Sequence, residues 1–422
     1  MAEHAAHQAT AAALLRHPKL WLVPTILTAL LALLLSLLYM GGIVNPNREL
    51  NDLPIALVND DTGKPPPGQK ENLGTQITSA IAADTGGGKV DWRTLTHAEA
   101  RDQLESGKVY GALLVPAGFT DTVTALTTPA ATRQPTLTVL TNPGKGSLGS
   151  SLASQITTKA AHRASRAIGG QLTKAAGPQV SPTVKVLLAD PVDVVTHVGH
   201  PIGADSGLGL TAFYYTLLLV LAGFMGGNVI SNGVDTALGY ADNEIGPWHT
   251  RRPTVPINRT QTLLLKMVMT AGITLVSASL ILVACVGVLG MDASHLPLLW
   301  VYSYCAALAV GLGVQAINAA FGGIGQLVSM FVFIVLGLPS SGATVPLQAV
   351  PGFYRFLSRF EPMRQLSDGV RAILYFDARG DAGLSRSWTM IAIGAVLALL
   401  FGFAMTRYYD RKGLKRLAPQ PV

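Results

Sequence analysis

Long apolar runs interrupt an otherwise polar chain, one near its beginning and the others in its second half. A bilayer core about 30 Å thick is crossed by a helix of about 20 apolar residues. Six runs approach or exceed that length and predict membrane spans at 20–44, 208–231, 263–289, 298–321, 324–338 and 388–406. Gly322 and Gly323 predict the turn between the fourth and fifth spans. The pattern therefore predicts a polytopic α-helical membrane protein of about six spans, arranged as one plus five.

Residues 45–205, between the first two spans, have the balance of a water-exposed domain, with 14 Lys/Arg and 14 Asp/Glu. Thr96 followed by Glu99 is a capping box that begins a helix. Short apolar runs predict strands at 54–58, 90–95, 109–115 and 136–141, and helical spacing predicts helices at 72–83 and 148–176. We expect an inserted α/β domain.

The remaining segments complete the predicted organisation. They are an amphipathic N-terminal segment (1–19), a membrane domain (208–406) with an inner loop (233–260) and a further loop (340–386), and a basic tail (407–422). Apolar residues recur at helical spacing in the 340–386 loop. This spacing predicts one or two amphipathic helices at the membrane interface, or dipping into it.

The positions of Lys and Arg predict the orientation, because basic residues gather on the cytoplasmic side. Eleven flank the spans on the side that would hold both termini, whereas six arginines lie in the 340–386 loop on the other side. We therefore expect a multi-pass protein of the cytoplasmic membrane, with both termini in the cytoplasm and residues 45–205 outside.

Composition changes this picture little. Only 13% of the residues are charged, against about 25% in soluble domains. The net charge of +7 comes mostly from residues beside the spans, which favours contact with membrane lipid over nucleic acid. Cys285 and Cys305 both fall within predicted spans and are interpreted as small apolar packing residues.

No catalytic, nucleotide or metal motif is evident. A Walker A loop needs Gly-x4-Gly-Lys-Ser/Thr, and the glycine-rich stretches at 86–89 and 144–147 do not fit it. No cysteine and no acidic pair lies close to His197 and His200 in the sequence, so a zinc site is not favoured. We expect no enzyme activity and no cofactor in this chain.

Neutral polar residues occur within the predicted spans, where charged residues are almost absent. Lys266 lies near a span start, where its long side chain can reach the interface. The neutral residues either bond helices together or line a substrate path. They are Asn228, Asn232, Gln315, Asn318 and Gln326. Gly223, Gly226 and Gly227 favour close helix packing.

The inner loop 233–260 is too long and varied for a simple turn. It contains Glu244, Trp248, Arg251 and Arg252. One interpretation is a helix on the membrane surface with Trp248 among the headgroups. The other is a docking surface for a cytoplasmic partner.

Three stretches carry a resemblance to a known family. They are Ile55 to Gly63, Tyr110 to Phe119, and the segment from Pro339 to Arg371 that includes Pro351-Gly352-Phe353 and Asp368-Gly369-Val370-Arg371. With the one-plus-five order of spans, they resemble permease subunits of type-2 ABC exporters, in the branch of the phage infection protein (YhgE/Pip) family. The resemblance covers nearly the whole chain, which lacks the long coiled coil of some members.

The resemblance implies a homodimer with an ABC-type ATP-binding subunit, so that ATP would be held by a partner. It implies a coupling helix in 233–260, a surface helix near 11–19 and a re-entrant 340–386 loop. The leading hypothesis is an exporter of an amphipathic or hydrophobic compound. The alternative is a non-transporting surface receptor or secretion scaffold that acts through its outer domain.

Overall fold

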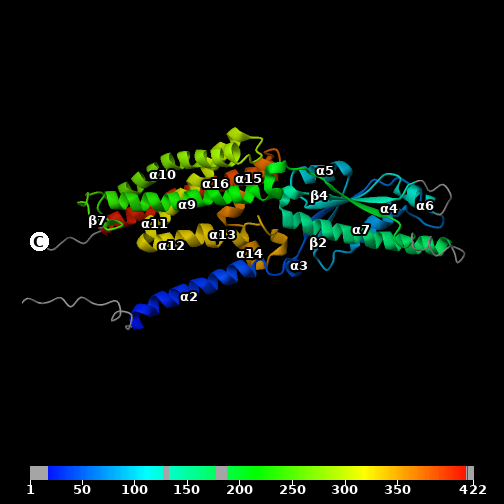
Figure 1. The fold of residues 1–422 in the computed structure, drawn as a ribbon, viewed down its shortest axis with the longest axis horizontal. Coiled ribbons are helices and arrows are strands. Elements are labelled where there is room, and N and C mark those ends of the chain that lie inside the picture. The colour runs from blue at the N-terminus through cyan, green and yellow to red at the C-terminus, as the bar shows by residue number, and fades with distance from the viewer. Residues whose placement is uncertain (1–17, 127–132, 177–187, 415, 417–422) are drawn as a thin grey trace, which may run out of the picture.

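The computed structural model describes residues 18–126, 133–176, 188–414 and 416. Long helices form one end of the molecule, and a small α/β domain forms the other (Figure 1). Most of the predicted N-terminal segment at 1–19 lies outside the described residues. The fold is mostly helical, as the apolar runs predicted.

The α/β domain lies between helices α2 and α9 in the sequence and is built around one five-stranded sheet in the order β2-β1-β3-β4-β5. Strands β2, β1 and β3 are parallel, β4 is antiparallel to β3, and β5 is parallel to β4. The strands are β1 (Leu53–Asn59), β2 (Val90–Leu95), β3 (Gly111–Val115), β4 (Thr136–Thr141) and β5 (Asp193–Val198).

Helices cover both faces of this sheet because successive strand residues point to opposite sides. Leu57 of β1 packs on one face with α4 and α7, whereas its neighbours Ala56 and Val58 pack on the other face with α5. The helices of this part are α3 (Pro46–Glu49), α4 (Leu73–Ala83), α5 (His97–Glu105), α6 (Phe119–Ala125) and α7 (Ser147–Ala176). The predicted capping box is present, since Thr96 and Glu99 bond to each other's backbone.

The helical end contains four helices that are long and apolar enough to cross a membrane among the described residues, spanning Thr211–Ala237, Arg259–Val288, Leu296–Ser340 and Leu384–Arg411. A shorter apolar helix covers Thr28–Gly41. The helical elements are α2 (Pro18–Gly41), α9 (Thr211–Ala237), α10 (Arg259–Leu282) continued by the π-helical segment η3 (Val283–Val288), α11 (Leu296–Phe321), α12 (Gly325–Met330), the π-helical segment η5 (Phe331–Val335), α13 (Gly337–Ser340), α14 (Gly352–Leu357), α15 (Pro362–Tyr375) and α16 (Leu384–Arg411). Large apolar side chains are exposed along α2, α10 and α16. This exposure suits lipid rather than water.

The stretch Leu296–Ser340 doubles back on itself. Gly322 has a φ of +61° and ends α11. Gly313, before the turn, lies against Phe333, after the turn. A Cβ built on Gly313 would be 2.6 Å from the Phe333 ring. The two halves therefore form a helical hairpin, and the turn predicted at Gly322-Gly323 is confirmed. The count of six membrane spans stays a prediction.

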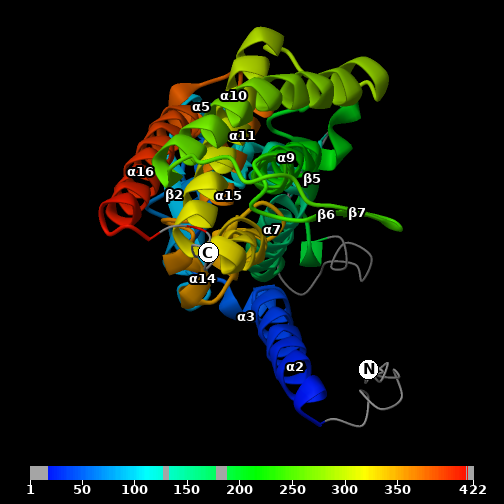
Figure 2. The same cartoon turned by 90° about the vertical axis from the view of Figure 1, so that its left-hand side faces the viewer.

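Helix α2 diverges from the other helices (Figures 1 and 2). Near its C-terminal end the Tyr354 hydroxyl donates to the carbonyl oxygen of Leu38 at 2.9 Å. Leu38 also belongs to a buried cluster with Leu53 and Ile55 at the start of the sheet. This cluster joins α2, the sheet and the 340–386 segment.

Helices α14 and α15 lie in the 340–386 segment, where the apolar spacing predicted one or two helices. Their location at the membrane interface stays a prediction. Val370 and Ile373 of α15 are fully buried against the long helices. Arg371 is 3% exposed, and its guanidinium donates to the carbonyl oxygens of Gly342 and Ala343 at 3.3 and 2.6 Å. An arginine of this loop is therefore accommodated by backbone carbonyls rather than by solvent.

Candidate ligand site in the helix bundle

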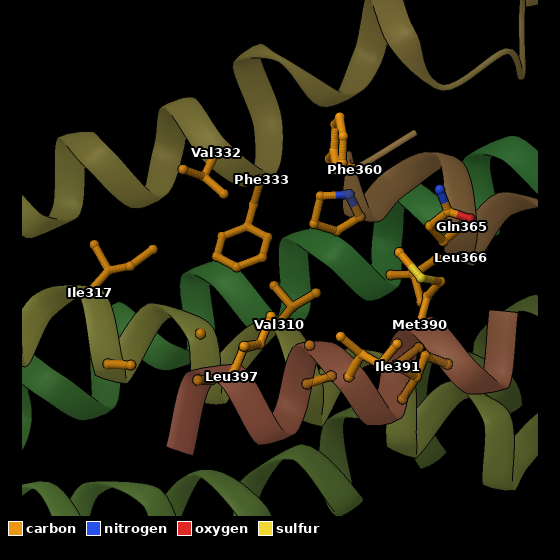
Figure 3. Close-up of a pocket in the computed structure, with 18 of the residues that line it drawn as sticks. Val310, Ile317, Val332, Phe333, Phe360, Gln365, Leu366, Met390, Ile391 and Leu397 are labelled. Atoms are coloured by element: carbon orange, nitrogen blue, oxygen red, sulfur yellow. The ribbon is translucent and has the colours of Figure 1, made fainter. Parts of the chain in front are cut away.

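A cavity of about 370 Å³ lies between α11, η5, α16 and the segment that begins α15 (Figure 3). Small side chains on one wall leave room for it. Ala306, Ala309, Gly313 and Ala316 follow one another at spacings of three and four residues, and all line the cavity. Residues at this spacing share one face of a helix, so α11 presents a shallow side there.

Aromatic and aliphatic side chains make the opposite walls. Phe333 projects from the π-helical segment η5, and Phe360 precedes α15. Met390, Ile391 and Leu397 belong to α16 (Figure 3). π-Helical insertions are rare and frequently occur at functional sites. The walls favour an apolar ligand.

Gln365 alone carries a polar side chain among the described residues that line the cavity. It is 2% exposed. Its amide nitrogen donates to the carbonyl oxygens of Ser358 and Arg359 at 3.1 and 3.3 Å, whereas its Oε1 has no hydrogen-bond partner. An unsatisfied buried acceptor costs free energy. Gln365 therefore adds one buried amide to an otherwise apolar wall.

The five predicted path residues lie elsewhere. Gln315 donates to the Gly227 carbonyl oxygen and to Thr270 Oγ1 at 2.9 and 3.1 Å. Asn318 donates to Asn228 Oδ1 at 2.9 Å. These three polar side chains bond helices α9, α10 and α11 together. Asn232 and Gln326 are exposed. None of the five lines the cavity, and a substrate path along them stays a prediction.

The 233–260 segment contains a β-hairpin between the end of α9 at Ala237 and the start of α10 at Arg259, so the expectation of a further helix in it was wrong. Strands β6 (Asn243–Ile245) and β7 (Trp248–Thr250) pair antiparallel across a turn at Gly246, whose φ is +58°. Glu244, Trp248, Arg251 and Arg252 are exposed, and Trp248 is 73% exposed. Arg251 lies 3.4 Å from a carboxylate oxygen of Asp242. The hairpin leaves all four residues accessible, and their docking role stays a prediction.

The sequence interpretation missed a largely buried ion cluster between the helices, in which Asp235 and Arg416 keep 18% and 25% of their side chains exposed. Lys266 was expected to reach the interface, but its side chain is only 7% exposed and its Nζ lies 2.9 Å from Asp235 Oδ1. Arg416 holds the same carboxylate at 2.6 and 2.9 Å. The only sequence signal was a lysine one turn inside an apolar run. Its partners are distant in sequence, so the cluster could not be recognised.

His200 belongs to the junction between the helices and the α/β domain. Its Nε2 lies 2.6 Å from the carbonyl oxygen of Tyr375, and its ring stacks on Phe376 at 5.5 Å between centroids. Arg379, just beyond α15, reaches Asp102 of α5 at 2.7 Å. Among the described residues no group of three or more His, Cys, Asp or Glu is arranged to hold a metal.

Helix α15 therefore contacts both parts of the molecule. Gln365 and Leu366 in its first half line the cavity, while at its end the Tyr375 carbonyl oxygen lies 2.6 Å from His200 Nε2, in the segment that follows β5. The Tyr375 hydroxyl lies 2.6 Å from Thr211 Oγ1 at the start of α9.

Comparison with known proteins identifies the family of the chain. The family model "Protein of unknown function (DUF3533)" matches residues 24–396. The "Uncharacterized protein YhgE" of Bacillus subtilis (strain 168) is 26% identical over 112 residues, which cover 26% of this chain. That alignment spans only 14% of the length of YhgE. Similarity to YhgE supports the predicted YhgE/Pip-like relationship.

Proposed function

We propose that this chain, which belongs to the family described as "Protein of unknown function (DUF3533)", is a permease subunit of a type-2 ABC-like exporter. It would move an amphipathic or hydrophobic compound across the cytoplasmic membrane. A second chain would supply the ATPase, and two copies of this chain would form the pathway.

The cavity beside Gln365 carries this proposal. It is lined by apolar side chains with one amide and lies among helices long and apolar enough to cross a membrane. Several of its lining residues are also exposed on the outside of the bundle, including Phe360 at 66% and Leu397 at 60%. An amphipathic molecule could therefore enter sideways from the lipid.

The β6–β7 hairpin supports a partner on the proposed cytoplasmic side. Trp248 of β7 and the two arginines directly after the hairpin, Arg251 and Arg252, are exposed, and Trp and Arg are enriched at protein interfaces. The sequence has no Walker A loop of its own, so in this proposal ATP is bound and hydrolysed by the docked chain.

A matched pair of glycine substitutions tests the cavity. Gly394 lines it, and Gly272 of α10 is an exposed helical glycine outside it. A Cβ on either would meet nothing within 4 Å, so both tolerate a larger residue. Gly394→Leu fills the cavity, whereas Gly272→Leu does not.

The measurement is resistance to, and efflux of, a panel of amphipathic dyes and antibiotics in cells that lack or carry the chain. We expect Gly394→Leu to lose most of the efflux at normal membrane abundance, and Gly272→Leu to keep it. Equal efflux in both variants would overturn the cavity's role. If no compound depends on the chain, and a phage or envelope partner binds its α/β domain, the receptor or scaffold alternative is favoured.

A further inference from the structure

A second cavity, of about 750 Å³, lies in the α/β domain between α4, α7 and strand β2. We refer to it as the α4–α7 groove. Ala160, Ala164 and Ala167 of α7 lie along it at spacings of four and three residues, so one face of α7 leaves room where larger side chains would close the space. The apolar residues of its floor are Ile77, Ile81, Trp92, Ile156 and Ile168.

The polar end of Trp92 is already satisfied, because its indole nitrogen donates to the carbonyl oxygen of Asp84 at 3.0 Å. Ile77, Ile81 and Ile168 are buried in the domain core. The floor is therefore part of a packed core and is preformed. Such a groove suits the apolar part of a ligand.

The rim of the groove is basic. Lys89, Lys159 and Arg163 line it together with one acidic residue, Asp84. Arg163 pairs with Asp84 at 2.9 Å. Across the described part of the chain, neither Lys89 nor Lys159 has an ion pair, so two positive charges remain uncompensated beside the apolar floor. Charge complementarity favours an anionic group there.

One end of the groove lies beside the apolar helix α2. Asn47 and Leu50 line this end, and they follow α2, which ends at Gly41, by only a few residues. If α2 lies in the membrane, a molecule leaving the bilayer surface has a short path into the groove.

We infer that the α4–α7 groove binds a single-chain amphiphile with an anionic head. The tail would lie on the isoleucine floor, and the head would meet Lys89 and Lys159. A volume of about 750 Å³ falls within the range of about 300–1,000 Å³ for small-molecule pockets, which suits one chain. This site is separate from the cavity beside Gln365 and does not depend on transport.

Photo-crosslinking in nanodiscs tests this inference with the full chain. The probe is palmitic acid that carries a diazirine near the end of its tail, and the matched neutral probe is the corresponding alcohol. We expect the acid to label peptides from α4 and from residues 155–171 of α7, and the alcohol to label them several-fold less. Mass spectrometry of the digested protein locates the labels.

Two variants sharpen the test. The double substitution Lys89→Ala and Lys159→Ala should lower labelling by the acid about fivefold, the effect of losing two exposed charge contacts, and leave labelling by the alcohol unchanged. Arg166→Ala is the control, because Arg166 is an exposed cation on α7 that does not line the groove.

Equal labelling by acid and alcohol, or labels confined to α10 and α16, would overturn the inference. So would an unchanged acid signal in a folded double variant. Competition on the wild-type chain gives a second measurement that needs no variant. Unlabelled palmitate should suppress the signal, and palmityl alcohol at the same concentration should suppress it several-fold less. Failure of this inference leaves the proposed export function standing, because efflux is measured separately.

Discussion

Lys266 of α10 and Asp235 of α9 form an ion pair, with the lysine Nζ 2.9 Å from Asp235 Oδ1, in a site where the lysine side chain is 7% exposed. Lys266 also donates to Ser231 Oγ at 2.9 Å, and Asp235 also accepts from Arg416. Asp235 is therefore the centre of a three-residue cluster that fixes α9, α10 and the C-terminal segment to one another.

The two partners of this pair should differ in their effect on stability. Asp235→Ala leaves two cations without their carboxylate, and breaking a buried pair costs about 3–5 kcal/mol. Lys266→Met leaves Asp235 paired with Arg416, so we expect a smaller loss. Thermal unfolding in detergent, with size-exclusion chromatography as the readout, measures the stability loss of both variants. A larger loss for Lys266→Met would contradict this arrangement.

The contact of α9 with α11 predicts opposite effects at two nearby glycines. A Cβ on Gly223 would lie 2.5 Å from the carbonyl oxygen of Ala307, whereas a Cβ on Gly226 would meet nothing within 4 Å. Gly223→Ala should destabilise the protein by about 1–3 kcal/mol through overpacking. Gly226→Ala should be neutral or slightly stabilising, because alanine favours helix.

The same detergent unfolding measurement compares these two glycine variants. Equal melting temperatures would mean that α9 and α11 do not approach each other at Gly223 as described.

The half-buried position of Lys145 predicts a pH dependence of stability. Its Nζ lies over the Tyr110 ring, 5.2 Å from the centroid. Burial lowers the pKa of Lys145 from 10.5 to about 8; Asp368 opposes this shift, and Arg364 and Arg371 add to it. Between about pH 8 and 10.5 the unfolded chain binds the proton more readily, so this residue's contribution makes stability rise with pH in that window.

Lys145→Met should remove that rise and stabilise the protein below about pH 8, where the folded state carries the cost of a buried charge. Lys174→Met is the control, since Lys174 is exposed on α7. Melting temperatures from pH 7 to 10.5 measure the effect. An identical pH profile for wild type and Lys145→Met would contradict the lowered pKa of Lys145.

Local signals in the sequence were sufficient for most elements. The capping box at Thr96 and Glu99 and the strand at 90–95 appear where they were predicted, because caps and strand-forming side chains are signals carried by adjacent residues. The turn at Gly322 needs a positive φ that glycine adopts readily. The hairpin at 243–250 was missed, although Gly246-Pro247 is a turn dipeptide. Its short strands have too little periodicity to identify.

The candidate site depended on packing that sequence alone does not reveal. The small residues from Ala306 to Ala316 were visible at helical spacing, but their opposite wall comes from η5, α15 and α16. Gln365 was one polar residue in an amphipathic segment. Its significance comes from the unpartnered Oε1, which depends on the position of the 358–359 carbonyls. Lys266 and Asp235 likewise meet only through helix packing.

A pull-down in mild detergent from native membranes tests most directly whether an ATPase docks at the β6–β7 hairpin. The tagged wild-type chain should recover an ABC-type ATP-binding protein in a ratio of about one to one. The Arg251→Glu and Arg252→Glu double variant should lose it, and Lys412→Glu, an exposed basic residue just after α16, should retain it. Docking at the hairpin is contradicted if the wild-type chain repeatedly recovers no ATPase, or if the double variant recovers as much ATPase as the wild type.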